Sequence, residues 1–157
     1  MPSVRSGENC LSHIQWFNDY LRLLRPKQWV KNIFVFLPAF FAGRIADFDL
    51  LRQSFIAFIS LCLLASVIYV LNDVMDRAAD RSHPVKRNRP VASGRASVRG
   101  ALILAFVLCI CGLAVAAGLG LSVLALACLY LAFNLAYRLG LKHLAIFDVF
   151  FVSCVYV

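Results

Sequence analysis

The sequence predicts an all-α, polytopic transmembrane helical bundle, and two observations carry this prediction. Hydrophobic residues make up 62% of the 157 residues and charged residues only 15%, whereas a soluble domain is about 45–50% apolar and about 25% charged. The apolar residues also gather in runs that approach the roughly 20 residues needed by a membrane-spanning helix. These features exclude a water-soluble globular domain and a disordered chain, which is poor in apolar residues.

Five apolar runs predict four full spans and a truncated fifth. Pro38 lies inside the first run, where neighbouring helices can satisfy the carbonyl that a proline leaves free. The last run begins near Leu144 and is still apolar at Val157, so we expect the chain to be part of a longer protein. A short helix buried against the other four is the alternative for this last run. The full spans are expected at about 30–46, 53–71, 100–117 and 121–137.

The chain is expected to contain two regions. Residues 1–28 form a polar tail, in which apolar residues recur at spacings of three and four from Ile14 to Leu24. This spacing predicts an amphipathic helix on the membrane surface, although an ordinary packed helix would have the same pattern. Residues 29–157 form the second region, the N-terminal portion of a transmembrane domain.

The net charge of +8 is confined to short stretches between the apolar runs. Lys and Arg concentrate on the cytoplasmic side of membrane proteins, so the N-terminus, the loop 77–99 and residues 138–143 are expected to be cytoplasmic, in an inner membrane. This distribution is typical of membrane topology and argues against a nucleic-acid partner. Five of the six cysteines lie inside apolar runs, and no pair has Cys-x-x-Cys spacing, which indicates packing residues.

The most informative stretch joins the second apolar run to the loop 77–99. If it is helical, Asn72, Asp76 and Asp80 fall on one face and Asp73 lies on the neighbouring stripe. Clustered carboxylates repel one another unless a cation compensates them, and oxygen ligands suit Mg²⁺, which typically binds carboxylates together with substrate phosphates. We therefore expect Mg²⁺ as cofactor, Asp73, Asp76 and Asp80 as catalytic residues, and Asn72, Asp73, Asp76 and Asp80 as metal ligands.

Cations follow the acidic stretch closely and predict contacts to phosphate oxygens, although any cytoplasmic loop can be basic for topological reasons alone. Another polar cluster follows the fourth run, where Tyr137 is either an interfacial aromatic residue or a phosphate donor. Asp148 is the only acid after Asp80, and an unpaired carboxylate inside a span is costly. The expected substrate-binding residues are Lys31, Asn72, Arg77, Lys86, Arg87, Arg89, Tyr137, Lys142 and Asp148.

Four motifs, in the same order, resemble those of the UbiA-type membrane prenyltransferase superfamily. They are Arg-Pro-Lys-Gln-Trp-Val-Lys-Asn at 25–32, the acidic stretch 72–80, the segment His83-Pro to Gly94, and the block from Tyr137 to Asp148. The first motif and the Leu-Lys-His of 141–143 most resemble the decaprenyl-phosphate phosphoribosyltransferase branch.

The resemblance implies helices around a central cavity and a second Asp-rich motif beyond this chain. It implies that phosphoribosyl passes from phosphoribosyl diphosphate to a polyprenyl phosphate, with Mg²⁺ holding the departing diphosphate. Prenyl transfer from a polyprenyl diphosphate to an aromatic acceptor and an inactive truncated half-enzyme are the alternatives. A transporter segment would also place acids at a membrane interface, but it would not require the dense basic loop. The expected partners are an isoprenoid lipid, a diphosphate donor and the bilayer, with the oligomeric state left open.

Overall fold

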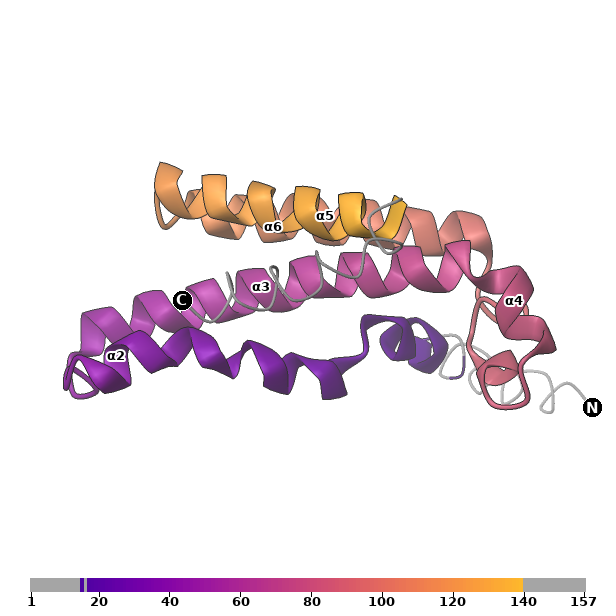
Figure 1. Ribbon diagram of the computed structural model, residues 1–157, viewed down its shortest axis with the longest axis horizontal. Coiled ribbons are helices and arrows are strands. Elements are labelled where there is room, and N and C mark those ends of the chain that lie inside the picture. Colours follow the sequence, from indigo (N-terminus) through magenta and orange to yellow (C-terminus); the bar gives the residue numbers. More distant parts are fainter. Residues whose placement is uncertain (1–14, 16, 140–157) are drawn as a thin grey trace, which may run out of the picture.

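Residue 15 and residues 17–139 are described by the structure, a computed structural model, and within these ranges the chain forms helices and no strand. The all-helical class is therefore confirmed for the described residues. In chain order (Figure 1), the elements after a helix of residues 17–24 are η1 (Pro26–Phe36), α2 (Leu37–Phe41), α3 (Phe48–Met75), α4 (Arg77–Ser82), η2 (Lys86–Asn88), α5 (Val98–Ala117) and α6 (Leu121–Leu139).

Three of these helices, α3, α5 and α6, are long and apolar enough to cross a membrane, which confirms the runs expected near 53–71, 100–117 and 121–137. The helix α3 has 28 residues, or about 42 Å at about 1.5 Å per residue, whereas the hydrocarbon core is about 30 Å thick. The helix α3 is therefore longer than one span requires. Its C-terminal turns carry the polar residues Asn72 and Asp73.

The first apolar run does not form a continuous α-helix, so a fourth full span is not confirmed. It contains the 3₁₀ helix η1, of 11 residues, and the short α2, of 5 residues. A 3₁₀ helix rises about 2.0 Å per residue, so the two elements together extend roughly 30 Å. Pro38 lies in the first turn of α2, where its missing N–H has no partner to lose. The fifth run, 144–157, lies outside the described residues.

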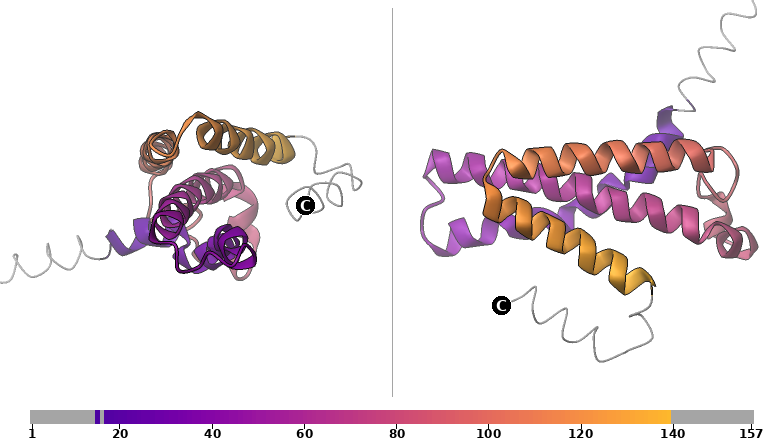
Figure 2. Two further views of the ribbon diagram at one scale, coloured as in Figure 1. Left: turned by 90° about the vertical axis from the view of Figure 1, so that its left-hand side faces the viewer. Right: turned by 90° about the horizontal axis from the view of Figure 1, so that it is seen from above.

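The helix α3 is central to the bundle, with η1 and α2 on one side and α5 and α6 on the other (Figures 1 and 2). Gly112 of α5 allows a close approach to α3, because a Cβ atom there would lie 2.7 Å from Cδ2 of Leu64. At the same contact, Ser60 donates its hydroxyl hydrogen to the Gly112 carbonyl at 2.8 Å. Small residues and interhelical hydrogen bonds of this kind are typical of helix packing in membranes.

The N-terminal helix packs one side against the bundle. Leu23 is fully buried in a core cluster with Val70 of α3 and Val91 of the loop before α5. Phe17 and Leu21, which belong to the stripe predicted from the spacing, are 57% and 40% exposed. The buried Leu23 therefore lies beside the predicted stripe. Within that stripe Phe17 and Leu21 remain exposed, and Leu24 is half-buried against the core cluster. The position of this N-terminal helix on the membrane surface and the region boundary at residue 28 stay predictions.

Candidate functional site

The acidic stretch is not one straight helix. The helix α3 ends at Met75, Asp76 has φ −83° and ψ 0°, and α4 begins at Arg77. Hydrogen bonds spaced by four residues still cross the joint, because the Asp76 N–H donates to the Asn72 carbonyl at 2.9 Å and the Asp80 N–H donates to the Asp76 carbonyl at 2.8 Å. The hydrogen bonding of a helix therefore continues through the motif, although the chain changes direction at Asp76. The three carboxylates lie in two environments, which differ in their arginine partners.

Asp73 and Asp80 form the inner environment, which is closed to solvent. Their exposed fractions are 2% and 3%. One nitrogen of Arg89, Nη1, lies 3.2 Å from Oδ1 of Asp73 and 2.7 Å from Oδ2 of Asp80, so both carboxylates share one guanidinium. Arg25 adds a second guanidinium, whose Nη2 lies 2.5 Å from the same Oδ1 of Asp73. We call these four residues the inner network.

The inner network is electrically balanced, since it contains two carboxylates and two guanidinium groups. Buried charges are costly unless they are paired and hydrogen-bonded. Among the described residues no buried side-chain nitrogen or oxygen lacks a hydrogen-bond partner. The guanidinium groups therefore stabilise the two buried carboxylates, and the removal of one member leaves the network with an unbalanced charge.

Arg25 reaches the network from an unusual backbone position. Its φ and ψ are 51° and 57°, and it is the one residue other than glycine with positive φ in the described part of the chain. A left-handed conformation costs an L-residue free energy and persists where the surroundings hold it. The guanidinium also lies over the ring of Tyr69, 5.3 Å from its centroid, at a distance that permits a cation–π interaction.

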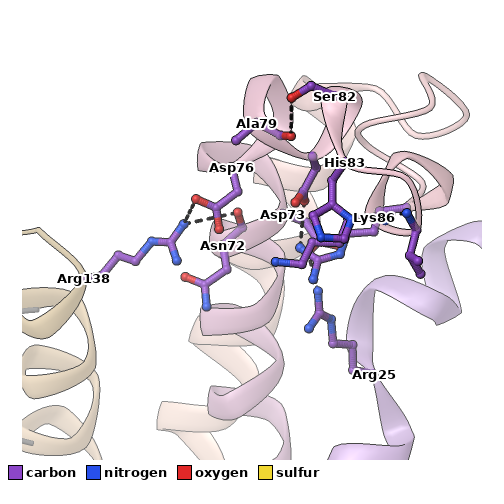
Figure 3. A network of polar contacts seen from close by, with 12 residues as sticks. Arg25, Asn72, Asp73, Asp76, Ala79, Ser82, His83, Lys86 and Arg138 are labelled. Atoms are coloured by element: carbon purple, nitrogen blue, oxygen red, sulfur yellow. Dashed lines mark hydrogen bonds and ion pairs between the residues drawn. The ribbon is translucent and has the colours of Figure 1, made fainter.

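Asp76 forms the outer environment with Arg138, which comes from the last turn of α6. Nη2 of Arg138 lies 2.5 Å from Oδ1 of Asp76 and donates to the Asn72 carbonyl at 3.4 Å. The Asp76 side chain is 44% exposed, in contrast to the buried Asp73 and Asp80. Figure 3 shows the two environments, with Arg138 approaching from one side of the motif and Arg25 from the other.

Arg25 and Arg138 are absent from the site residues expected from the sequence, although both hold an aspartate of the motif. One sequence signal pointed to the place of Arg25, because the residue before a proline is disfavoured in a helix, and Pro26 therefore marks the end of the preceding helix. Arg138 closes an apolar run at the same membrane side as the acidic stretch. Neither signal identifies which acid these arginines contact.

The remaining expected residues lie around the network rather than in it. Arg77 is half-buried in α4, and Lys86 and Arg87 are exposed on η2. Lys31 is exposed on η1, six residues beyond Arg25, about 12 Å at the rise of a 3₁₀ helix. Tyr137 is 38% exposed on α6. Lys142 and Asp148 lie outside the described residues.

The four expected metal ligands are not gathered at one point. Within the described residues, no group of three or more His, Cys, Asp and Glu side chains is placed to hold a metal. Asp73 and Asp80 are nevertheless joined through a single nitrogen, and both offer oxygen donors. Because Mg²⁺ usually binds one or two carboxylates together with phosphates of a substrate, the donor chemistry of this pair fits Mg²⁺, with Arg89 now between the two carboxylates.

Several known proteins are similar to this chain over most of its length. A decaprenyl-phosphate phosphoribosyltransferase of Mycolicibacterium smegmatis is 39% identical over 137 residues, which cover 85% of this chain and 43% of that protein. Another, of Corynebacterium glutamicum, is 41% identical over 143 residues, which cover 85% of this chain and 41% of that protein. The nodulation protein NoeC of Azorhizobium caulinodans is 37% identical over 140 residues, with 89% of this chain and 45% of that protein covered.

The chain thus spans less than half the length of these curated relatives. The family model of the UbiA prenyltransferases matches residues 32–157, which include the whole acidic stretch, the basic loop and the three apolar helices. Together with these helices, the match identifies an integral membrane protein. The resemblance seen in the four motifs is therefore confirmed, and the chain belongs to the UbiA prenyltransferase family.

Proposed function

We propose that this chain supplies the N-terminal part of a Mg²⁺-dependent membrane transferase that moves phosphoribosyl from phosphoribosyl diphosphate to a polyprenyl phosphate. The observation that carries the proposal is the inner network, a buried set of two carboxylates and two arginines at one end of α3. Relatives named decaprenyl-phosphate phosphoribosyltransferase, at about 40% identity, support the choice of donor and acceptor.

The chemistry of the site suits the departure of a diphosphate. When bound, Mg²⁺ would neutralise the negative charge that collects on the leaving diphosphate. Asp73 and Asp80 would hold the ion, and the half-exposed Asp76, with Asn72 in the same motif, would offer a further oxygen to the ion or to its bound water. Arg77, Lys86 and Arg87 form no ion pair with any described acid, so their charges are available to phosphate oxygens. Lys31, Tyr137, Lys142 and Asp148 remain proposed substrate contacts.

Both substrates must reach this site, one from water and one from the bilayer. The end of α3 that carries the network joins the basic loop 77–99, which holds seven Lys and Arg residues, and we place this end at the edge of the apolar layer. A charged, soluble donor fits this side, and the positive-inside rule assigns it to the cytoplasm. We therefore propose an inner-membrane enzyme whose N-terminus and Asp-rich loop are cytoplasmic, with the isoprenoid chain held by the apolar helices.

A chimera tests the proposal, since the chain covers only part of its relatives. Residues 20–139 would replace the corresponding part of the Corynebacterium glutamicum relative, and membranes would receive labelled phosphoribosyl diphosphate with decaprenyl phosphate. We expect Mg²⁺-dependent transfer, abolished by EDTA and by Asp76→Asn in a protein that stays folded, because Asp76 is half-exposed. Near-wild-type turnover of that variant would contradict the assigned site.

The same membranes distinguish the prenyl-transfer alternative, which the description of the family as prenyltransferases favours. A polyprenyl diphosphate with an aromatic acceptor would replace the two substrates in a parallel reaction. Product only in this arm would overturn the phosphoribosyl assignment and leave the Mg²⁺–diphosphate site standing. A chimera inactive with both donors would favour the inactive half-enzyme.

A further inference from the structure

The two arginines of the inner network contact the same oxygen of Asp73, but they are held in different ways. Arg25 contacts one carboxylate, lies over the Tyr69 ring, and has a left-handed backbone. The carbonyl just before it, on Leu24, accepts a hydrogen bond at 2.9 Å from Ser66, which is fully buried in α3. Both its backbone and its side chain are therefore fixed to α3.

Arg89 is not tied to α3 by its backbone: its N–H donates to the Lys86 carbonyl at 2.9 Å and its carbonyl accepts from the Ser93 N–H at 2.9 Å, both within residues 86–93. It lies in the loop between η2 and α5, immediately after Asn88, and its backbone is extended, with φ −63° and ψ 144°. Its single nitrogen Nη1 bridges Asp73 and Asp80, and a quarter of its side chain is exposed. A guanidinium has five N–H donors in a planar fork, so a bridge through one nitrogen leaves the rest of the fork available to another anion.

We propose that Arg25 is a positioning residue that stays on Asp73, whereas Arg89 is an exchangeable counterion that leaves Asp73 and Asp80 for the diphosphate when a divalent cation enters between these carboxylates. This inference rests on the proposed function, because it assigns the order of partners at the same site. The resting network remains neutral without a metal, and Arg89 carries its charge to the phosphate at the moment the metal replaces it.

The exchange predicts that the removal of Arg89 changes the affinities for a divalent ion and for diphosphate in opposite directions. Arg89 occupies the place of the cation, so its removal strengthens the binding of a divalent ion alone. Arg89 also binds the diphosphate, so the same removal weakens the binding of diphosphate alone. Arg25 stays on Asp73 in both states, so its removal does not free a metal position. A general electrostatic effect would instead act in the same way for both arginines, since each contributes one charge near the same oxygen.

The test uses the purified full chain in lipid nanodiscs and three variants that each remove one charge. Arg89→Gln is the test, Arg25→Gln is the comparison at the same carboxylate, and Arg95→Gln is the matched control, because Arg95 lies in the same loop but pairs with Asp19 at 3.1 Å. The binding of Mn²⁺ alone is followed by the electron paramagnetic resonance of the free ion. The binding of inorganic pyrophosphate is followed in EDTA by equilibrium dialysis.

We expect R89Q to bind Mn²⁺ about tenfold more tightly and pyrophosphate about tenfold more weakly than wild type, within the range of usual coupling energies. R95Q should change neither affinity by more than about twofold, and R25Q should not tighten Mn²⁺. Equal tightening in R25Q and R89Q would reduce the effect to electrostatics and overturn the exchange. If R25Q does not fold, Arg77→Gln replaces it as the electrostatic comparison, because Arg77 lies in α4 between Asp76 and Asp80 along the chain and pairs with no described acid. Tightening of Mn²⁺ in R77Q equal to that in R89Q would overturn the exchange.

The two proposals fail in different ways. If the wild-type chain binds pyrophosphate but R89Q does not tighten Mn²⁺, the exchange is overturned and the proposed function stands. If neither wild type nor any variant binds pyrophosphate or Mn²⁺, both are overturned. Tighter Mn²⁺ in R89Q, combined with weaker pyrophosphate, supports the exchange.

Discussion

Replacement of Asp73 by Asn should destabilise the chain far more than the same replacement of Asp76, three residues away. Asp73 is 2% exposed, and its Oδ1 lies 2.5 Å and 3.2 Å from nitrogens of Arg25 and Arg89. Asparagine keeps the shape of aspartate but not its charge, so D73N leaves one positive charge unpaired in the inner network. D76N instead loses a partner of Arg138 at a half-exposed position.

The magnitudes follow from burial. Removal of one partner from a buried ion pair costs about 3–5 kcal/mol, and the guanidinium groups here keep roughly a quarter of their exposure, so we expect about 2–3 kcal/mol for D73N. A surface pair contributes about 0–1 kcal/mol, which bounds D76N. For a chain of this size, about 1 kcal/mol shifts the unfolding midpoint by about 2–4 °C, so D73N should lower it by about 5–10 °C and D76N by less than about 4 °C.

Buried Cys62 provides the assay. Its side chain is 1% exposed in α3, so a thiol-reactive dye labels it only when the bundle opens. Replacement of the other five cysteines by Ala leaves Cys62 as the single thiol that is labelled. The unfolding midpoint would be measured in detergent for wild type, D73N and D76N, at low and at high salt. Salt should reduce the effect of D76N and leave that of D73N, because buried pairs are screened little. Equal shifts for the two variants would refute the division into inner and outer environments.

Two further predictions concern the bundle. Gly112→Val should destabilise it by about 1–3 kcal/mol through overpacking against Leu64, whereas Ala114→Val, on the exposed face of α5, should change the same unfolding midpoint little. Asp47 caps α3 by accepting the N–H of Leu50, and this bond lowers the pKa of Asp47. Its charge should therefore stabilise α3 above the usual pKa of Asp and cease to do so as the pH falls from about 5 to about 3. Asp47→Asn keeps the cap, and its midpoint should converge with that of wild type over this interval.

The sequence sufficed for the bundle because three of its spans are continuous apolar runs of the required length. It did not suffice for the first run, which is also rich in apolar residues but contains the 3₁₀ helix η1. Apolar content alone does not distinguish helix types. The hydrogen bonds that hold η1 against α3 come from distant partners, as when Trp29 donates to Ser66 at 3.0 Å and Asn32 donates to Cys62 at 3.3 Å.

For the site, the spacing of the acids was informative, but their grouping was not. Spacing places Asn72, Asp76 and Asp80 on one face only if the helix is straight. In the structure Asp80 instead shares Arg89 with Asp73, seven residues earlier and therefore two helical turns away on nearly the same face. The partners of these acids also lie far away along the chain, on η1, in the loop before α5 and at the end of α6. Periodicity describes one helix at a time, so it carries no information about such contacts.

The acidic motif therefore has a structural role that is separate from any chemistry. Its three aspartates pair with arginines from three segments that are distant along the chain. Arg25 contacts Asp73, Arg89 contacts both Asp73 and Asp80, and Arg138 contacts Asp76. Loss of activity on replacing a buried aspartate of the motif would follow from loss of the fold alone, and so would not identify a metal ligand.

Asp76 is the informative position, because its exposure separates the two effects. Its pair with Arg138 is partly solvated, so replacement by Asn should leave the fold intact, while an oxygen needed by metal or diphosphate would still be weakened. Arg138→Gln breaks the same pair from the other side and leaves the carboxylate in place. An inactive but folded D76N chimera, together with an active R138Q chimera, would therefore assign Asp76 to the chemistry. Equal losses in both would assign it to the connection between α3 and α6.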